Sequence, residues 1–215
     1  MISMNIKGVI FDLDGVIVST DHFHYLGWKR LSDEEGIYFD EKINNRLRGV
    51  SRMESLEIIL ENAIKTYTEE EKKEMAQRKN SYYIEYLSEL TDKDILPNVL
   101  KTLNALKEKK IKIAIGSSSK NTPIILKRIG LDDYFDAVSD GNDIKRSKPD
   151  PEVFLIACKR LNILPKECIV VEDAKSGIDA ANAGGMISLA VSDAFGYEKA
   201  DYSLKNIEDV LTLFK

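Results

Sequence analysis

The sequence predicts an α/β protein: a doubly wound, parallel-sheet core with a small α-helical domain inserted near its start. A short apolar run close to the N-terminus leads straight into two carboxylates and a glycine. Residues 20–90 then space their apolar side chains as helices do and contain almost nothing typical of a strand. After Thr91, strand-like runs alternate with helical segments, as in βα units. We therefore expect a discontinuous core of residues 1–16 and 92–215 and an inserted domain of residues 17–91.

The first predicted strand is the apolar run Gly8–Phe11. A continuous run of this kind suits a strand that is buried on both faces at the centre of a parallel sheet. Ligands of such sheets bind at the carboxyl ends of the strands, and Asp12 and Asp14 lie at that end of this strand. Gly15 then permits a sharp exit of the chain.

Each helix predicted in the inserted domain begins at a side chain that can cap an N-terminus. Ser51 has Glu54 three residues later, which is the spacing of a capping box. The first helix is expected to end before Gly36, because glycine readily adopts the left-handed conformation that closes many helices. The expected N-caps are Thr20 or Asp21, Ser51 and Thr68, with the last helix running to about Leu90.

The alternation after Thr91 predicts further strands joined by helices. Pro97 and Pro151 favour helix starts, and right-handed crossovers constrain the topology. The expected strands are residues 111–116, 135–139, 168–171 and 186–191, and the expected helices are residues 97–110, 124–129, 151–161, 174–183 and 207–214.

The composition bounds the possible partners. The 215 residues include 43% hydrophobic and 31% charged residues and carry a net charge of −5, so we expect no general attraction to nucleic acid or to an anionic membrane. No apolar run reaches transmembrane length, and acidic residues interrupt the first apolar stretch, which argues against a signal peptide. Cys158 and Cys168 lie in apolar contexts, which favours reduced thiols and a cytoplasmic protein. With a complete core, the chain is expected to act as a monomer.

The two carboxylates after the first strand need a chemical explanation. Unpaired, Asp12 and Asp14 would repel each other and lose hydration. Mg²⁺ removes both costs, because it binds carboxylate oxygens together with a substrate phosphate. One carboxylate could also attack phosphorus and form an aspartyl phosphate. The simpler alternative is that both residues only cap turns.

Polar groups also follow the second predicted strand. Ser117, Ser118 and Ser119 precede Lys120 and Asn121 at the start of a helix. Hydroxyls and backbone N–H groups at such a place can hold a phosphate, although serine is also a common helix cap.

Two later segments complete the pattern. Lys148 precedes Pro149, which favours an extended backbone, and a lysine held there could neutralise a phosphoryl group. Glu172 and Asp173 end a buried apolar run and could complete a magnesium site. Alone, Lys148 would be a surface lysine and Asp173 a helix cap.

In this order, the motifs resemble those of the haloacid dehalogenase-like superfamily of phosphotransferases, and the resemblance covers the whole chain. It implies a Rossmann-like core, with the inserted helices as a small cap domain. The matching segments are DLDGV at 12–16, the strand end at Ser117, Lys148-Pro149 and Glu172-Asp173.

The inserted domain and the run 117–121 of the core are similar to those of the β-phosphoglucomutases. Ser118, where alanine is usual, and Ser19, where aspartate usually precedes Thr20, are departures from their pattern. The similar segments are Gly49-Val50-Ser51-Arg52 with Ser55, His24 with Trp28, Arg78-Lys79-Asn80, and the run 117–121.

This resemblance implies roles for individual residues. Asp12 would be the nucleophile and Asp14 the general acid and base. Mg²⁺ would bind Asp12, the Asp14 backbone carbonyl, Glu172 and Asp173. Arg52 would hold the non-transferring phosphate, because its planar fork suits bidentate binding. The implied substrate-binding residues are Thr20, His24, Trp28, Gly49, Val50, Ser51, Arg52, Ser55, Lys79, Ser117, Ser118, Ser119, Lys120, Asn121 and Lys148.

The implied reaction converts β-D-glucose 1-phosphate to glucose 6-phosphate, with glucose 1,6-bisphosphate as the activating phosphoryl donor. The main rival is a sugar-phosphate or phosphoglycolate phosphatase, which lets water attack the same aspartyl phosphate. A non-catalytic phosphate-binding protein is the remote alternative. A transition-metal site at His22 and His24 is disfavoured, because no other nitrogen or sulfur ligands lie nearby in the sequence.

Overall fold

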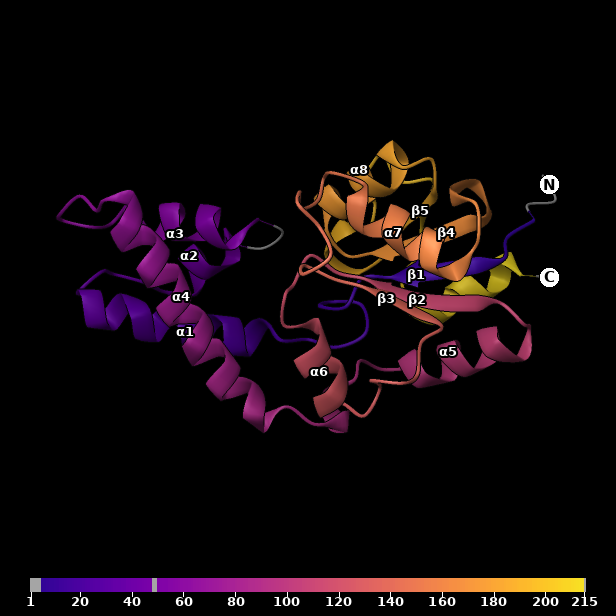
Figure 1. Ribbon diagram of the computed structural model, residues 1–215, viewed down its shortest axis with the longest axis horizontal. Helices are drawn as coiled ribbons and strands as arrows, with labels where there is room; N and C mark the ends of the chain where they lie inside the picture. Colours follow the sequence, from indigo (N-terminus) through magenta and orange to yellow (C-terminus); the bar gives the residue numbers. More distant parts are fainter. Residues whose placement is uncertain (1–4, 48–49, 215) are drawn as a thin grey trace. The chain divides into compact units, whose positions relative to one another are not determined.

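The structure is a computed structural model that describes residues 5–47 and 50–214. By contacts within the chain, it divides into two compact units (Figure 1). The sheet unit comprises Met1–Ser19 and Thr91–Lys215, and the helical unit comprises Thr20–Leu90. The chain thus enters the helical unit directly after the first strand and returns from it once.

The sheet unit is built on parallel strands. Over the described residues, six strands form one sheet in the order β3-β2-β1-β4-β5-β6. Phe11 of β1 is in register with Ile115 of β2 and with Val171 of β4, so these three strands end at the same edge. The strands are β1 Gly8–Phe11, β2 Lys112–Gly116, β3 Ala137–Ser139, β4 Cys168–Glu172, β5 Ile187–Ala190 and β6 Tyr202–Ser203.

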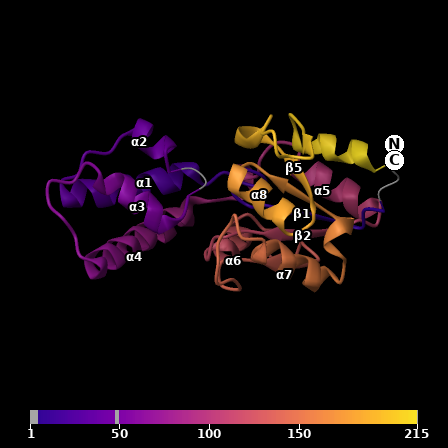
Figure 2. The same ribbon diagram turned by 90° about the horizontal axis from the view of Figure 1, so that it is seen from above.

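Helices cover both faces of this sheet, which confirms the doubly wound fold. Ile10, Ala114 and Val170 belong to one core cluster with the apolar side chains of α7 and α8. Figures 1 and 2 show α5 on the opposite face. The helices of this unit are α5 Val99–Glu108, α6 Thr122–Arg128, α7 Glu152–Leu161 and α8 Lys175–Ala183, with the 3₁₀ segments η2 Asp92–Asp94, η3 Pro165–Glu167, η4 Ser192–Ala194 and η5 Ile207–Leu213.

Apart from short 3₁₀ segments and shifts of one or two residues at element ends, the sheet unit differs from the sequence expectation in three ways. Strand β6 was not expected, because two residues are too short to show a period. The expected C-terminal helix is the 3₁₀ segment η5. Helix α5 begins after Pro97 rather than at it, because Leu96 donates its N–H to the Ile17 carbonyl (2.9 Å) and Asn98 adopts a left-handed conformation.

The helical unit has a core of its own. Trp28, Leu31, Leu56, Ile59 and Met75 are buried together in one apolar cluster. The elements of this unit are α1 Asp21–Glu35, α2 Glu41–Asn45, α3 Arg52–Leu60, α4 Glu69–Tyr86 and the 3₁₀ segment η1 Leu87–Glu89.

The predicted caps Ser51, Thr68 and Gly36 of this unit are confirmed. Thr20 precedes α1, but its side chain makes no cap hydrogen bond, and α4 ends at Tyr86, followed by η1, rather than running to about Leu90. Ser51 accepts the Glu54 N–H, and the Glu54 carboxylate accepts the Ser51 N–H in return. Thr68 and Glu71 form the same capping box at the start of α4. Gly36 ends α1 with a φ of 67°. The boundaries of these helices therefore follow from local sequence.

Two further expectations concern the whole chain. Among the described residues, no helix combines the length and the apolar character that a membrane span needs. Cys158 and Cys168 are both buried free thiols, as expected.

Candidate active site

Three carboxylates meet at the carboxyl edge of the sheet. Asp12 follows β1, Glu172 is the last residue of the neighbouring strand β4, and Asp173 comes next. Each offers an oxygen within 4.8 Å of the others, and we call this set the acidic cluster. The Asp12 N–H donates to the Val171 carbonyl (3.0 Å), which continues the strand pairing to the site itself. The cluster is therefore positioned by the most buried strands of the sheet.

Lys148 reaches this cluster from the loop between β3 and α7. Its Nζ lies 2.5 Å from Asp12 Oδ1 and also donates to Glu172 Oε1. The side chains of Lys148, Asp12 and Glu172 are only 9%, 12% and 1% exposed. Although burial favours its neutral form, the adjacent carboxylates of Asp12 and Glu172 raise the pKa of Lys148. A fixed positive charge therefore stands beside Asp12.

One lysine does not balance the negative charge of the cluster. Burial raises the pKa of Glu172 to about 7, with Lys148 opposing the rise and Asp12 adding to it. Burial, and then the charges of Asp12, Glu172 and Asp14, raise the pKa of Asp173 to about 9. Both shifts mean that crowded carboxylates hold protons at neutral pH unless a cation replaces them.

These residues fit a magnesium ion. The donors are all oxygens, and they converge from two adjacent strand ends. Burial, and then the neighbouring carboxylates, raise the pKa values of Glu172 and Asp173, and a divalent cation would relieve this crowding of negative charge. Asp14 lies half-buried in the turn after β1. The Gly15 N–H in that turn donates to the Val18 carbonyl at 2.7 Å, which makes the turn tight.

The polar loop after β2 ends at the same edge. Ser117 is buried, and its Oγ accepts the Ser119 N–H at 3.2 Å. Ser119 Oγ in turn accepts the N–H of Asn121, the N-cap residue of α6 (3.2 Å). Ser118 Oγ faces the Lys148 N–H at 3.5 Å, whereas Lys120 is exposed. Some of the polar groups of this loop therefore form hydrogen bonds within the loop and stabilise its conformation.

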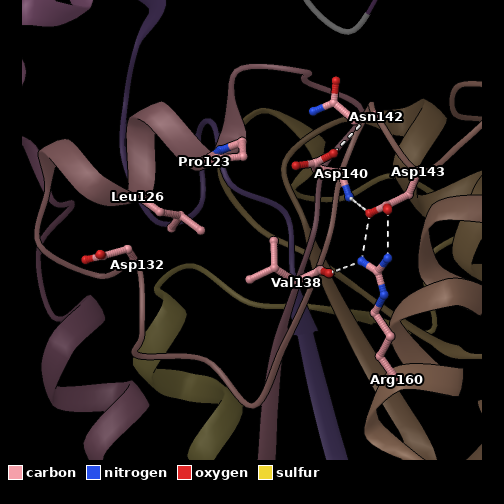
Figure 3. A pocket seen from close by; sticks show the side chains of 8 residues that line it. All are labelled: Pro123, Leu126, Asp132, Val138, Asp140, Asn142, Asp143 and Arg160. Atoms are coloured by element: carbon pink, nitrogen blue, oxygen red, sulfur yellow. Dashed lines mark hydrogen bonds and ion pairs between the residues drawn. The ribbon is translucent and has the colours of Figure 1, made fainter.

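A second turn supports this loop. The Gly141 N–H donates to the Ser119 carbonyl (3.1 Å), and the Asn142 side-chain amide donates to the Lys120 carbonyl (3.0 Å). The same turn lines a pocket of about 370 Å³, to which no acidic-cluster residue contributes. Figure 3 shows the Arg160 guanidinium directed at the Asp143 carboxylate, with N–O distances of 2.7 and 2.6 Å. This ion pair fixes the turn on which the loop rests.

The helical unit brings together another group of predicted residues. Lys79 is buried, and its Nζ lies 2.8 Å from His24 Nδ1 and 4.8 Å from the centre of the Trp28 ring. Burial, and then the charges of Lys79 and Arg52, lower the pKa of His24 well below its ordinary value. His24 is therefore neutral at pH 7 and accepts the lysine hydrogen bond at Nδ1, which places its own proton on Nε2.

Tyr83 organises this group, although nothing in the sequence marks it as a site residue. Its ring stacks on His24 with centroids 4.1 Å apart, and its hydroxyl donates to Thr20 Oγ1 at 3.0 Å. Lys79 also lies over the Tyr83 ring, 4.9 Å from its centre. A tyrosine on the apolar face of an amphipathic helix is usually a core residue, so the sequence gives no indication of this role.

The remaining predicted residues lie around α3. Arg52 is exposed and donates to Asn80 Oδ1 (2.8 Å). Ser51 serves as the N-cap, Ser55 is buried, and Val50 is exposed. Gly49 lies outside the described residues.

The comparisons with known proteins agree with this geometry. The sequence matches the haloacid dehalogenase-like hydrolase family over residues 6–185. The chain therefore belongs to the haloacid dehalogenase-like hydrolases, a class that fits its parallel sheet and its acidic cluster. The family expected from the motifs is confirmed.

Particular relatives narrow the comparison. The β-phosphoglucomutase of Bacillus subtilis (strain 168) is 42% identical over 206 residues, which cover 95% of this chain and 91% of that protein. A crystal structure of β-phosphoglucomutase from Clostridium difficile is 42% identical, with a TM-score of 0.85 over 95% of this chain and 93% of that one. A phosphorylated carbohydrates phosphatase of Thermotoga maritima is 34% identical over 183 residues, or 84% of this chain and 82% of that protein. Relatives of this chain thus include a mutase and a phosphatase.

Proposed function

We propose that this protein is a β-phosphoglucomutase, which interconverts β-D-glucose 1-phosphate and glucose 6-phosphate. The observation that carries the proposal is the 42% identity with a β-phosphoglucomutase over 95% of the chain, which includes both units. The acidic cluster supports phosphoryl transfer. The positive charges of Lys79 and Arg52 in the helical unit, which both lower the pKa of His24, support binding of an anionic substrate.

Asp12 is the proposed nucleophile. A carboxylate oxygen of Asp12 bonds to phosphorus as the bond from phosphorus to the donor oxygen breaks, and Asp14 gives a proton to that oxygen. Asp14 then takes the proton of a sugar hydroxyl, whose oxygen attacks phosphorus and releases the Asp12 carboxylate. This yields glucose 1,6-bisphosphate, which turns round and returns its other phosphate to Asp12.

The surroundings of Asp12 suit this chemistry. Lys148, fixed 2.5 Å from Asp12 Oδ1, stabilises the charge of the transferring group, and Ser117 at the end of β2 binds its oxygens. The acidic cluster and the Asp14 backbone carbonyl would hold Mg²⁺, which would supply further charge stabilisation. Burial of the acidic cluster limits the access of water to an acyl phosphate.

We propose that residues 17–91 act as a cap domain that selects the substrate. Arg52 is the proposed ligand of the second phosphate, with Lys79 adding positive charge. The geometry in favour is that Lys79, His24 and Arg52 are electrostatically linked within the helical unit. A cytoplasmic location and a monomeric state remain predictions.

The test is a coupled assay with β-glucose 1-phosphate, Mg²⁺ and a trace of glucose 1,6-bisphosphate. Glucose 6-phosphate and free phosphate are measured in the same reaction. The proposal expects glucose 6-phosphate in large excess over phosphate, and it expects Asp12→Asn to abolish turnover. Release of phosphate without isomerisation would contradict it.

A phosphatase is the second candidate, favoured by the 34% identity with a carbohydrate phosphatase. The variant Arg52→Ala separates the two. A mutase should lose isomerisation while it still hydrolyses a simple aryl phosphate, because only the two-phosphate reaction needs Arg52. Equal loss of both activities would remove the proposed role of Arg52. Failure to bind Mg²⁺ or fluoroberyllate, a mimic of the phosphoryl group on Asp12, would instead revive the non-catalytic alternative.

A further inference from the structure

Gly177 lies within a helix, where most other residues are more favourable than glycine. It is the third residue of α8 and has no positive φ, so the backbone itself does not require glycine. Alanine would normally be the more favourable residue in a helix, because glycine loses more backbone freedom on folding. A reason outside the helix is therefore needed for glycine at this position.

The side chain of Glu172 supplies that reason. A Cβ at position 177 would lie 2.0 Å from both Cδ and Oε1 of Glu172, and 2.5 Å from Oε2. Carbon and oxygen atoms cannot approach so closely, so either the helix or the carboxylate would have to move. The space that alanine would fill at position 177 is the space that the Glu172 carboxylate occupies.

Glu172 has little freedom to move away. Its Oε1 accepts from Lys148 Nζ, and its Oε2 accepts the Ala174 N–H at 3.0 Å. The side chain is 1% exposed, so no open solvent lies beside it. If the Glu172 carboxylate moved, it would lose these hydrogen bonds and would no longer lie beside the carboxylates of Asp12 and Asp173.

Asp173 shows the same relation to a second glycine. A Cβ at Gly15 would lie 1.9 Å from Oδ2 and 2.5 Å from Cγ of Asp173. Gly15 also has a φ of +86°, which strains any other residue, so a substitution there would mix two effects. Gly177 is therefore the position that can be tested cleanly.

We infer that Gly177 is a positioning residue for metal binding: its missing side chain leaves the slot that holds the Glu172 carboxylate in the acidic cluster. Gly15 leaves the corresponding slot for Asp173. The inference rests on the proposed function for the identity of the ion, Mg²⁺, but the steric relation between Gly177 and Glu172 can be tested without it.

The experiment measures Mg²⁺ binding by titration calorimetry, without substrate, for four proteins: wild type, Gly177→Ala, Glu172→Asp and the double variant. Gly177→Ala should weaken Mg²⁺ binding by about 10- to 100-fold, as the loss of a supporting contact around a metal ligand does. Aspartate is one methylene shorter and leaves room for alanine. In the Glu172→Asp background, the same change at position 177 should therefore alter the affinity by less than about twofold.

The melting temperature of the metal-free proteins gives a second reading. Gly177→Ala should lower it in the Glu172 background and raise it in the Glu172→Asp background, where only the helix preference for alanine remains. Gly184→Ala is the control at the C-cap of the same helix, because its Cβ would meet Met186 Cε and Pro151 Cβ but no atom of the acidic cluster. This control should leave the Mg²⁺ affinity unchanged.

Each outcome decides the matter. If Gly177→Ala binds Mg²⁺ as wild type does, or loses affinity equally in both backgrounds, Gly177 does not act through Glu172. If Gly177→Ala fails to fold, folding of the double variant supports the inference, and failure of both overturns it. A wild-type protein that binds no Mg²⁺ would count against the proposed function, whereas the two melting shifts would still test the slot.

Discussion

Replacing Lys148 by methionine should expose the charge imbalance of the acidic cluster. Methionine has a similar length but no charge, so Asp12 and Glu172 would face each other without the cation that now contacts both. Removing one partner of a buried ion pair typically costs about 3–5 kcal/mol of stability. The side chains involved are at most 12% exposed, so solvent would screen little of this loss. We expect the metal-free variant to lose about that amount at alkaline pH.

The loss should depend on pH with a definite sign. The folded-state pKa of Glu172 is raised to about 7 from an ordinary value of 4.5, so the folded protein binds this proton more tightly than the unfolded chain does. Stability therefore falls as the pH rises between these two values. Lys148 opposes this rise, so its removal moves the pKa of Glu172 further up. Each added unit of pKa corresponds to about 1.4 kcal/mol, and the difference between wild type and variant should grow from pH 6 to pH 8.5.

The assay is urea denaturation followed by circular dichroism, in chelator and then in Mg²⁺. Mg²⁺ at one hundred times its dissociation constant should stabilise the folded state by about 2.7 kcal/mol. Lys159→Met, at an exposed position of α7, is the control and should change stability by less than about 0.5 kcal/mol. A Lys148→Met protein within that same margin at both pH values would refute the reasoning, because Lys148 would then not be the counterion.

Three other predictions concern stability. Glu35→Gln should cost about 1–3 kcal/mol at pH 7, because Arg78 and Tyr67 hydrogen bonds lower the pKa of Glu35; the loss should shrink as the pH falls below 4.5, and Trp28 fluorescence can follow it. Gly141→Ala should cost about 1–3 kcal/mol in thermal unfolding, because its Cβ would lie 2.4 Å from a backbone oxygen of the loop at 117–121. Ser51→Ala should cost about 0.5–2 kcal/mol in the same measurement, because it removes one half of a capping box; no change would show that the cap does not stabilise α3.

Local signals explain why most of the fold could be predicted. Helix α1 ends at Gly36, and α3 begins after Ser51, because caps depend on residues within one turn. Strand β4 is an unbroken apolar run and is buried along its length. Strand β6 is two residues long and is defined by pairing with β5, which no local pattern encodes. The start of α5 was misplaced for the same reason, since a hydrogen bond from Leu96 to a distant carbonyl holds that segment extended.

The residues of the candidate site also differ in how far the sequence predicts them. Asp12 and Glu172 could be selected from sequence because both end buried strands, and parallel strand ends meet at one edge. Lys148 contacts both residues and lies 136 residues from Asp12 in the sequence. Only the order of the motifs suggests this contact. Gly177 and Gly141 gave no signal, because a glycine in a helix or turn shows its neighbour only in three dimensions. The roles of Asp12, Glu172 and Lys148 in catalysis are proposals.

The division of labour between the two units bears on the choice between mutase and phosphatase. In the proposed mechanism, every group that touches the transferring phosphoryl belongs to the sheet unit, including Asp12 and Lys148. A mutase and a phosphatase can share that chemistry, since they differ in whether a sugar hydroxyl or water attacks the aspartyl phosphate. The proposed groups that favour the sugar, Arg52 and Lys79, belong to the helical unit. Substitutions in the sheet unit should therefore reduce transfer to sugar and to water together, whereas substitutions of Arg52 or Lys79 should change the ratio of the two.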